Sequence, residues 1–135
     1  MVFGEPKPTP ETEPFWAAAQ EGRLSIQRCR SCTRHYFYPR AYCPNCGCAD
    51  VEWTDVSGRA RLESYVINHR PLPGAESLSP IIALVVLEEG PRMMTTIVGV
   101  EPDPAKLALD QPLTVTFEDR GDVRVPVFTP AEVHQ

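Results

Sequence analysis

The chain has 135 residues, of which 42% are hydrophobic and 23% charged, so its composition is that of a soluble globular protein with room for one modest core. The formal net charge of −5 does not favour general affinity for polyanions, and no run of about 18 apolar residues is present to span a membrane. Fifteen prolines favour short strands and turns over long helices.

The N-terminal stretch predicts a linker followed by one short helix. Residues 1–13 are rich in proline, glutamate and threonine, a composition that stays extended and hydrated, either as a free tail or as the join to an upstream domain. Residues 14–22 then combine a proline suited to a helix's first turn, an alanine run and a terminal glycine. Phe15 and Trp16 are large for so short a helix, so they either pack on their own domain or dock on another chain.

Two Cys-x-x-Cys pairs follow, Cys29 with Cys32 and Cys43 with Cys46. This spacing brings four soft thiolates to one tetrahedral ion, as in structural zinc sites. After the second pair Gly47 lets the backbone curl tightly and direct amide hydrogens at the sulfurs, whereas the first pair has the less suitable Thr33 at that place. We therefore predict a zinc ribbon, with strands at residues 24–28 and 36–39.

These cysteines are compatible with other chemistry. Disulfides would suit a secreted domain, but no apolar leader precedes them, which favours the cytoplasm. A redox role would need one Cys-x-x-Cys pair at a strand-to-helix junction, whereas this chain has two matched pairs, which makes a redox role less suitable. Iron uses the same four sulfurs in rubredoxin-like sites, so the choice between zinc and iron stays open. Cys48, the fifth cysteine, is expected to be a free thiol, with exchange for Cys46 as the alternative.

Charge around the predicted ribbon is strongly positive. The arginines between residues 23 and 46, a stretch without acids, are Arg23, Arg28, Arg30, Arg34 and Arg40. They offset the negative charge of a zinc–thiolate cluster, or they meet phosphate, either of nucleic acid or of a coenzyme. By contrast, residues 52–135 hold thirteen acids against seven lysines and arginines. His35 is expected to be a solvated loop residue rather than a substitute ligand.

From residue 56 the hydrophobic pattern has a period of two. It predicts five strands, separated by glycine, proline and aspartate turns, at residues 59–70, 80–88, 92–100, 113–118 and 123–128. Five short antiparallel strands indicate a small closed barrel of the OB-fold type, with a half-sandwich as the alternative. The predicted fold is thus mainly β, with a linker (1–13), a short helix and zinc ribbon (14–55) and a five-stranded OB-fold barrel (56–135).

The second predicted strand is apolar on both faces. Residues 81–87 read Ile-Ile-Ala-Leu-Val-Val-Leu, whereas a barrel has a single interior. Its outer face must be covered by the ribbon, the helix or a partner protein, which makes this strand the main sequence argument for an interface. No catalytic motif or phosphate-binding glycine loop is present. His69 with Arg70 lies at a strand end, where a cation pair binds phosphate or stays solvated.

Taken together, these motifs resemble the OB-fold proteins with a rubredoxin-like zinc ribbon known as domain of unknown function 35. The resemblance runs from residue 14 nearly to the end, and is carried by Pro14-Phe15-Trp16, Glu21-Gly22-Arg23-Leu24, the two cysteine pairs, Tyr38-Pro39-Arg40, Trp53, Ser57-Gly58-Arg59, Ala83-Leu84-Val85, Glu88-Glu89-Gly90 and Pro126-Val127-Phe128. Ala60 departs from the small residue, often glycine, expected there.

The resemblance implies a non-catalytic subunit that accompanies thiolase-superfamily enzymes acting on acyl-CoA. The expected partner is a thiolase-like enzyme of the lipid-transfer-protein type, a retro-aldolase of steroid side-chain degradation, in a heteromeric complex with two copies of each chain. In that group the domain is often fused behind a MaoC-like hydratase half. We expect coenzyme A contacts at Arg59, Arg61 and Arg70. The expected partner interface comprises Phe15, Trp16, Ile82, Leu84, Val86 and Phe128.

Two other functions are compatible with the same modules. A nucleic-acid-binding role is common to zinc ribbons and OB-folds, but it needs aromatic residues on a basic barrel face. Here the barrel half is acidic and its aromatics are few, chiefly Tyr65, Phe117 and Phe128. We therefore expect no nucleic-acid partner. A stand-alone acyl-CoA-binding protein is the third reading, and it would require affinity for the ligand without a partner.

Overall fold

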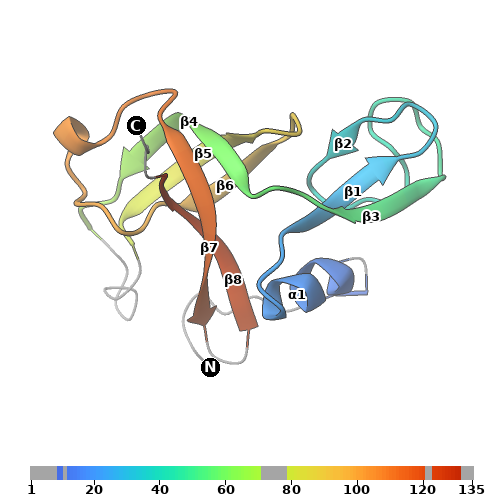
Figure 1. The fold of residues 1–135 in the computed structure, drawn as a ribbon, viewed down its shortest axis with the longest axis horizontal. Helices are drawn as coiled ribbons and strands as arrows, with labels where there is room; N and C mark the ends of the chain where they lie inside the picture. The colour runs from blue at the N-terminus through green and yellow to red at the C-terminus, as the bar shows by residue number, and fades with distance from the viewer. Residues whose placement is uncertain (1–8, 11, 71–78, 121–122, 132–135) are drawn as a thin grey trace.

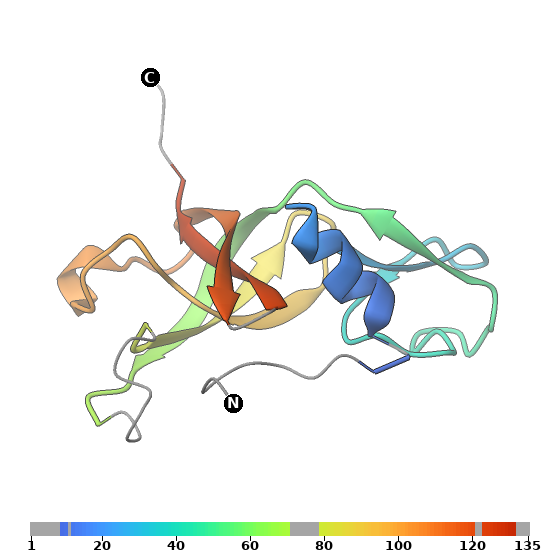
Figure 2. The ribbon, with the colours of Figure 1, turned by 90° about the horizontal axis from the view of Figure 1, so that it is seen from below.

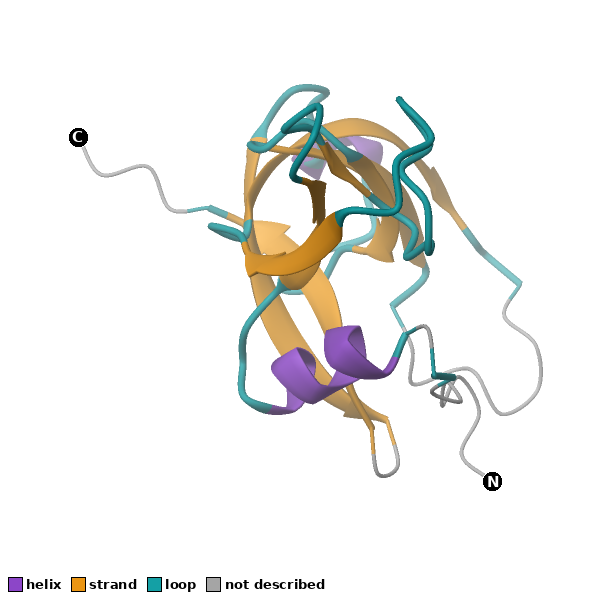
Figure 3. Cartoon of the chain, turned by 90° about the vertical axis from the view of Figure 1, so that its right-hand side faces the viewer, coloured by secondary structure: helices purple, strands orange, loops and turns teal. Residues whose placement is uncertain are grey.

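The computed structural model describes residues 9–10, 12–70, 79–120 and 123–131 (Figure 1). A three-stranded ribbon and a five-stranded barrel stand side by side, with helix α1 (Glu13–Gln20) packed against strands of both. Figure 2 shows α1 lying between the two units, and Figure 3 shows it in front of the β7–β8 hairpin. Most of the predicted N-terminal linker lies outside the described residues.

Helix α1 forms as the sequence predicts. A proline occupies its first turn, and the chain leaves the helix through Gly22, whose φ of +75° suits glycine. The buried side of the helix consists of Phe15, Ala18 and Ala19. Since Phe15 is only 5% exposed and belongs to the main core, the helix is held by its own chain.

The ribbon sheet has the order β2-β1-β3, with β1 at Ser25–Cys29, β2 at His35–Tyr36 and β3 at Val51–Asp55. β2 is shorter than the predicted strand at 36–39. The chain bends after Tyr36, whose hydroxyl donates to the Arg40 carbonyl at 2.9 Å, while the Arg40 N–H donates to the Gln27 side chain at 2.6 Å. β3 was not foreseen as a strand, and His35 lies in β2 rather than in a loop.

The second unit is a nearly closed antiparallel barrel. Its strands are β4 (Arg59–Ile67), β5 (Ile81–Leu87), β6 (Arg92–Thr96), β7 (Pro112–Arg120) and β8 (Val123–Pro130), with a 3-10 turn at Pro104–Lys106 before β7. Their order is β6-β5-β4-β7-β8, and a parallel bridge between Ile97 and Phe128 joins the two ends. This closure confirms the five-stranded OB-fold barrel over the half-sandwich. The first and third strands end earlier than predicted, at Ile67 and Thr96.

One continuous core joins the two units. The barrel interior is filled by fully buried side chains, among them Leu62, Val85 and Phe128, and the same cluster includes Leu24 and Ile26 of the ribbon side. A second small cluster, Cys29, Tyr36 and Cys43, surrounds the cysteine site. The ribbon is therefore packed on the barrel through one side, while its other end has almost no apolar core of its own.

Gly58 fixes the junction between ribbon and barrel. Its φ is +79°, and a Cβ at this position would collide with the side chain of Val115 on β7. Next to it, the Ser57 N–H donates to a carboxylate oxygen of Glu89 at 3.0 Å. The connection is thus tight, and it defines how the ribbon lies beside the barrel.

Candidate metal centre and apolar face

The two Cys-x-x-Cys turns have matching backbone geometry. In each, the N–H of the residue after the second cysteine donates to the carbonyl of the first cysteine, from Thr33 to Cys29 and from Gly47 to Cys43, both at 2.8 Å. Both donors have positive φ, +64° for Thr33 and +78° for Gly47. Because a β-branched residue is strained in that region, the first turn is the less ideal one, as its sequence indicates.

The four predicted ligands converge at these turns. All four sulfurs lie within 4.8 Å of one another, with Cys29 to Cys46 and Cys32 to Cys43 at 3.6 Å. A tetrahedral zinc with Zn–S bonds of about 2.3 Å requires sulfurs about 3.8 Å apart. The Cys32 N–H donates to the Cys29 sulfur at 3.4 Å, and the Asn45 N–H to the Cys43 sulfur at 3.3 Å. The predicted ligand set is therefore confirmed as positioned to bind one metal ion.

Electrostatics within the cluster favour a cation. The N–H of Cys32 lowers the pKa of the Cys29 thiol. Burial raises the pKa of Cys43, but N–H groups of Cys46 and Asn45 outweigh it and lower that pKa to about 6. The N–H of Cys48 lowers the pKa of Cys46, yet the neighbouring thiols and burial together raise it to about 12. Four sulfurs this close cannot all be anionic unless a cation lies between them.

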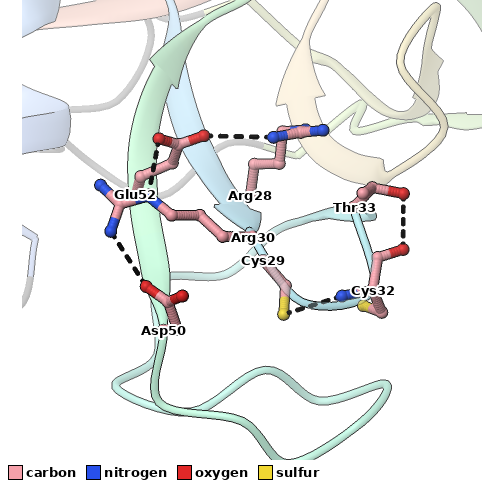
Figure 4. A network of polar contacts seen from close by, with 7 residues as sticks. All are labelled: Arg28, Cys29, Arg30, Cys32, Thr33, Asp50 and Glu52. Atoms are coloured by element: carbon pink, nitrogen blue, oxygen red, sulfur yellow. Dashed lines mark hydrogen bonds and ion pairs between the residues drawn. The ribbon is translucent and has the colours of Figure 1, made fainter.

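Three of the five ribbon arginines are paired with acids, and Figure 4 shows two of them, Arg28 and Arg30. Glu52 on β3 bridges Arg28 at 3.2 Å and Arg30 at 3.1 Å, and Arg30 also reaches Asp50 at 2.9 Å. Arg23 is paired likewise, with Asp55 at 2.7 Å. These three guanidinium groups therefore have carboxylate partners within the chain itself. Their partners follow directly after the acid-free stretch and reach them through the β1–β3 pairing.

Arg34 and Arg40 are the other two arginines of the basic stretch. Within the described residues neither guanidinium makes an ion pair. Both line a groove of about 630 Å³ between the ribbon and the β5–β6 turn, together with His35 and Arg92. Sequence reasoning singled out the basic stretch but did not indicate which of its arginines would stay unpaired.

The arginines predicted to contact coenzyme A do not converge. Arg59 pairs with Glu88, and Arg61 lies 3.9 Å from Asp110. Both are at the start of β4, whereas Arg70 lies beyond its end, and a nine-residue strand separates the two places by roughly 25 Å. Arg59, Arg61 and Arg70 therefore cannot form one compact phosphate site.

The outer face of β5 is apolar and partly open to solvent. Ile81, Ala83, Val85 and Leu87 point into the core, and Ile82, Leu84 and Val86 point outward. Ile82 is 37% exposed and is paired with Val66 on β4, which is 61% exposed. Leu84 is paired with Met94 on β6, also 61% exposed. We call the surface of Val66, Ile82, Leu84, Val86 and Met94 the β4–β6 face.

An apolar cleft of about 380 Å³ borders this face. It opens between α1, ribbon residues 37–39 and strands β6 and β8, and its lining includes Trp16, Tyr38, Met94, Thr96 and Pro126. Of the predicted interface residues, Phe15, Trp16 and Ile82 line this cleft, and Leu84 and Val86 lie on the adjoining face. Phe15 is only 5% exposed, and Phe128 is fully buried in the core of the chain itself.

Among the described residues no helix is long and apolar enough to cross a membrane.

The fold and the four-cysteine cluster together define a protein built from a rubredoxin-like zinc ribbon and an OB-fold barrel. Two family models match this division: the ChsH2 zinc ribbon domain over residues 16–52 and the C-terminal OB-fold domain of ChsH2 over residues 53–118.

Similar proteins make the assignment more specific. A probable enoyl-CoA hydratase alpha subunit of Thermomonospora curvata is 36% identical over 87% of this chain, and the 3-oxo-4,17-pregnadiene-20-carboxyl-CoA hydratase alpha subunit of Mycobacterium tuberculosis is 30% identical over 94%. The chain spans only 37% and 40% of those relatives. A DUF35 domain-containing scaffold protein of Pyrococcus furiosus is 35% identical over 71% of both chains.

Among solved structures, a chain of the Ltp2-ChsH2(DUF35) aldolase superposes with a TM-score of 0.82 at 31% identity, covering 93% of this chain and 98% of that one. The chain belongs to the DUF35 family, and within it is similar to ChsH2. The zinc ribbon assignment of the family agrees with the sulfur geometry, which confirms the predicted structural zinc site.

Proposed function

We propose that this chain is a non-catalytic accessory subunit of an aldolase that acts on acyl-CoA, most specifically a retro-aldolase of steroid side-chain degradation. Its partner would be a thiolase-like subunit of the lipid-transfer-protein type, called the Ltp2-type subunit below, with two copies of each chain in a cytoplasmic complex. The proposal rests on similarity to the ChsH2(DUF35) chain of an aldolase and to the alpha subunit of a steroid acyl-CoA hydratase.

The observation that carries the proposal is the β4–β6 face. Ile82, Val66 and Met94 are contiguous through strand pairing and exposed, although they lie on the outside of a barrel whose interior is already full. Contiguous exposed apolar surface of this kind marks protein interfaces. The ribbon and the helix pack elsewhere on the barrel and leave this face open, so a second polypeptide is the natural cover.

Beside the active site of the Ltp2-type subunit, this chain would have a structural and an electrostatic role. Zinc, when bound by the four cysteines, supplies a fixed fold for the ribbon and no open coordination position for catalysis. In the neighbouring groove, unpaired Arg34 and Arg40 offer two guanidinium groups suited to the phosphates of coenzyme A. We therefore move the proposed coenzyme A contacts from β4 to this groove.

Co-expression with an Ltp2-type subunit tests the proposal. We expect the two chains to co-purify as one complex and the complex, but neither chain alone, to cleave a carbon–carbon bond in a panel of acyl-CoAs. Arg34→Ala combined with Arg40→Ala should raise KM for the acyl-CoA and leave assembly intact, whereas the paired Arg59→Ala should change neither. A monodisperse lone chain that never alters the activity of the other subunit would contradict the proposal.

A further inference from the structure

Building on the proposed function, we propose that the free edge of β6 binds an extended segment of the Ltp2-type subunit by strand addition. The segment would enter the apolar cleft along the open seam between β6 and β8 and pair with the backbone of Met94. The partner contact would then consist of two joined parts, side-chain packing on the β4–β6 face and backbone hydrogen bonds at the seam.

The register of the barrel shows which backbone groups are free. The Leu87 N–H donates to the Pro91 carbonyl at 2.9 Å, and the Ile97 N–H donates to the Ile81 carbonyl at 3.1 Å. These two bonds bracket an uninterrupted antiparallel register, so every second residue of β6 bonds to β5. Met94 is one of the residues between these bonded positions, so its N–H and C=O point away from β5 and into the seam.

Strand β8 is not paired with β6 at Met94. It is joined to the end of β6 where the Val98 N–H donates to the Phe128 carbonyl at 2.8 Å. Two residues earlier stands Pro126, which has no N–H to continue that pairing. Its carbonyl instead accepts a weak bond from the Thr95 hydroxyl at 3.4 Å. Among the described residues the bridge at Ile97 and Phe128 is not continued to Met94 by any strand pairing, so this edge of β6 is unpaired there.

The surroundings of this edge favour an extended polypeptide. The cleft is apolar, and its walls carry Trp16, Tyr38 and Val125, so alternate side chains of an added strand would find apolar contacts. Thr96, also in the lining, has a buried hydroxyl that no described group satisfies. The cleft is continuous with the β4–β6 face through Ile82 and Met94, which belong to both.

Two substitutions at one position separate backbone from side-chain contributions. Met94→Ala removes the side chain and keeps the N–H, whereas Met94→Pro also removes the N–H that faces the seam. Proline is tolerated at an edge position whose N–H is not used in the sheet, so both variants should fold. We expect Met94→Pro to weaken binding to the Ltp2-type subunit at least about tenfold more than Met94→Ala does.

Amide hydrogen exchange, followed by NMR on the free chain and on the complex, gives a second measurement. The Met94 amide should exchange fast in the free chain and about a hundredfold more slowly in the complex, whereas the Met93 and Thr95 amides, bonded to β5, should be protected in both. Equal binding by the two Met94 variants, with no new protection at Met94, would overturn strand addition while the complex itself stands.

The same measurements distinguish other occupants. If the Met94 amide of the free chain is already protected and becomes exposed when residues 1–8 are deleted, the chain's own N-terminal segment fills the seam and the proposal is wrong. Protection that grows with the concentration of the free chain would indicate a second copy, which also overturns it. If the wild-type chain forms no complex with the Ltp2-type subunit, the proposed function and strand addition are both overturned, whereas equal binding by the Met94 variants overturns strand addition alone.

Discussion

The ribbon and the barrel are stabilised in different ways. The barrel buries large side chains such as Leu62 and Phe128 completely, and its five strands form one nearly closed sheet around them. The metal end of the ribbon has only Tyr36 and its buried cysteines for a core. The barrel has thus filled its interior and still has apolar surface left over outside, while the ribbon, with so small a core, is expected to depend on a metal for its fold.

The largest expected effect comes from removing a ligand. Cys43→Ser should abolish stoichiometric metal binding and unfold the metal end of the ribbon, because structural zinc contributes roughly 10 to 16 kcal/mol in small zinc domains. Metal analysis together with amide exchange should show a loss confined to residues 25–55. The matched control is Cys48→Ser, which lies outside the four-sulfur cluster and should keep its metal. Retention of metal and melting temperature by Cys43→Ser would contradict the contrast between the two units.

The next effect concerns the barrel. Phe128→Ala should destabilise the chain by about 3 to 5 kcal/mol, because a fully buried aromatic side chain leaves a cavity in a closed core. Urea unfolding measures this, and Leu109→Ala, whose side chain is 64% exposed, should change stability by no more than about 0.5 kcal/mol. Metal should stay bound under native conditions. A loss of metal at equal urea stability would show that the ribbon, not the barrel, depends on Phe128.

The smallest effect is a dependence on pH. Hydrogen bonds from Arg30 and then Arg28 hold the pKa of Glu52 below its ordinary value of 4.5. A lowered carboxyl pKa stabilises the fold above the ordinary value, and this contribution is lost as the pH falls through the folded value. Glu52→Gln should therefore melt slightly below wild type at pH 7, with the difference shrinking below pH 4.5. Calorimetry that shows a constant difference would refute the role of this ion pair.

Much of this architecture is readable from the residues. The spacing of the cysteines specifies the ligands, because a tetrahedral ion demands four thiolates in two turns. The period of two from residue 56 predicts the barrel. The doubly apolar β5 could be recognised, yet which of its faces points inward could not, because both alternating sets are equally apolar. The same ambiguity applies to Phe128 and its neighbour Val127, which are both buried.

What the sequence could not show depends on tertiary pairing. Strand β3 is short and mixed in polarity, and it forms because β1 offers an edge with the register of Gln27 opposite Trp53. That pairing also brings Glu52 to Arg28 and Arg30, which leaves Arg34 and Arg40 as the unpaired arginines of the ribbon's basic stretch. The open seam at Met94 follows from the register of three strands and one proline, which no local pattern indicates.

The β4–β6 face is expected to be covered by a partner, and a binding titration tests this expectation most directly. Wild-type chain, Ile82→Asp and Leu109→Asp would each be titrated calorimetrically into the Ltp2-type subunit, after confirming that all three melt alike. We predict that Ile82→Asp weakens binding at least about tenfold, because it places an unpaired charge in an apolar interface, while Leu109→Asp binds like wild type. Equal affinity of all three chains would contradict the account.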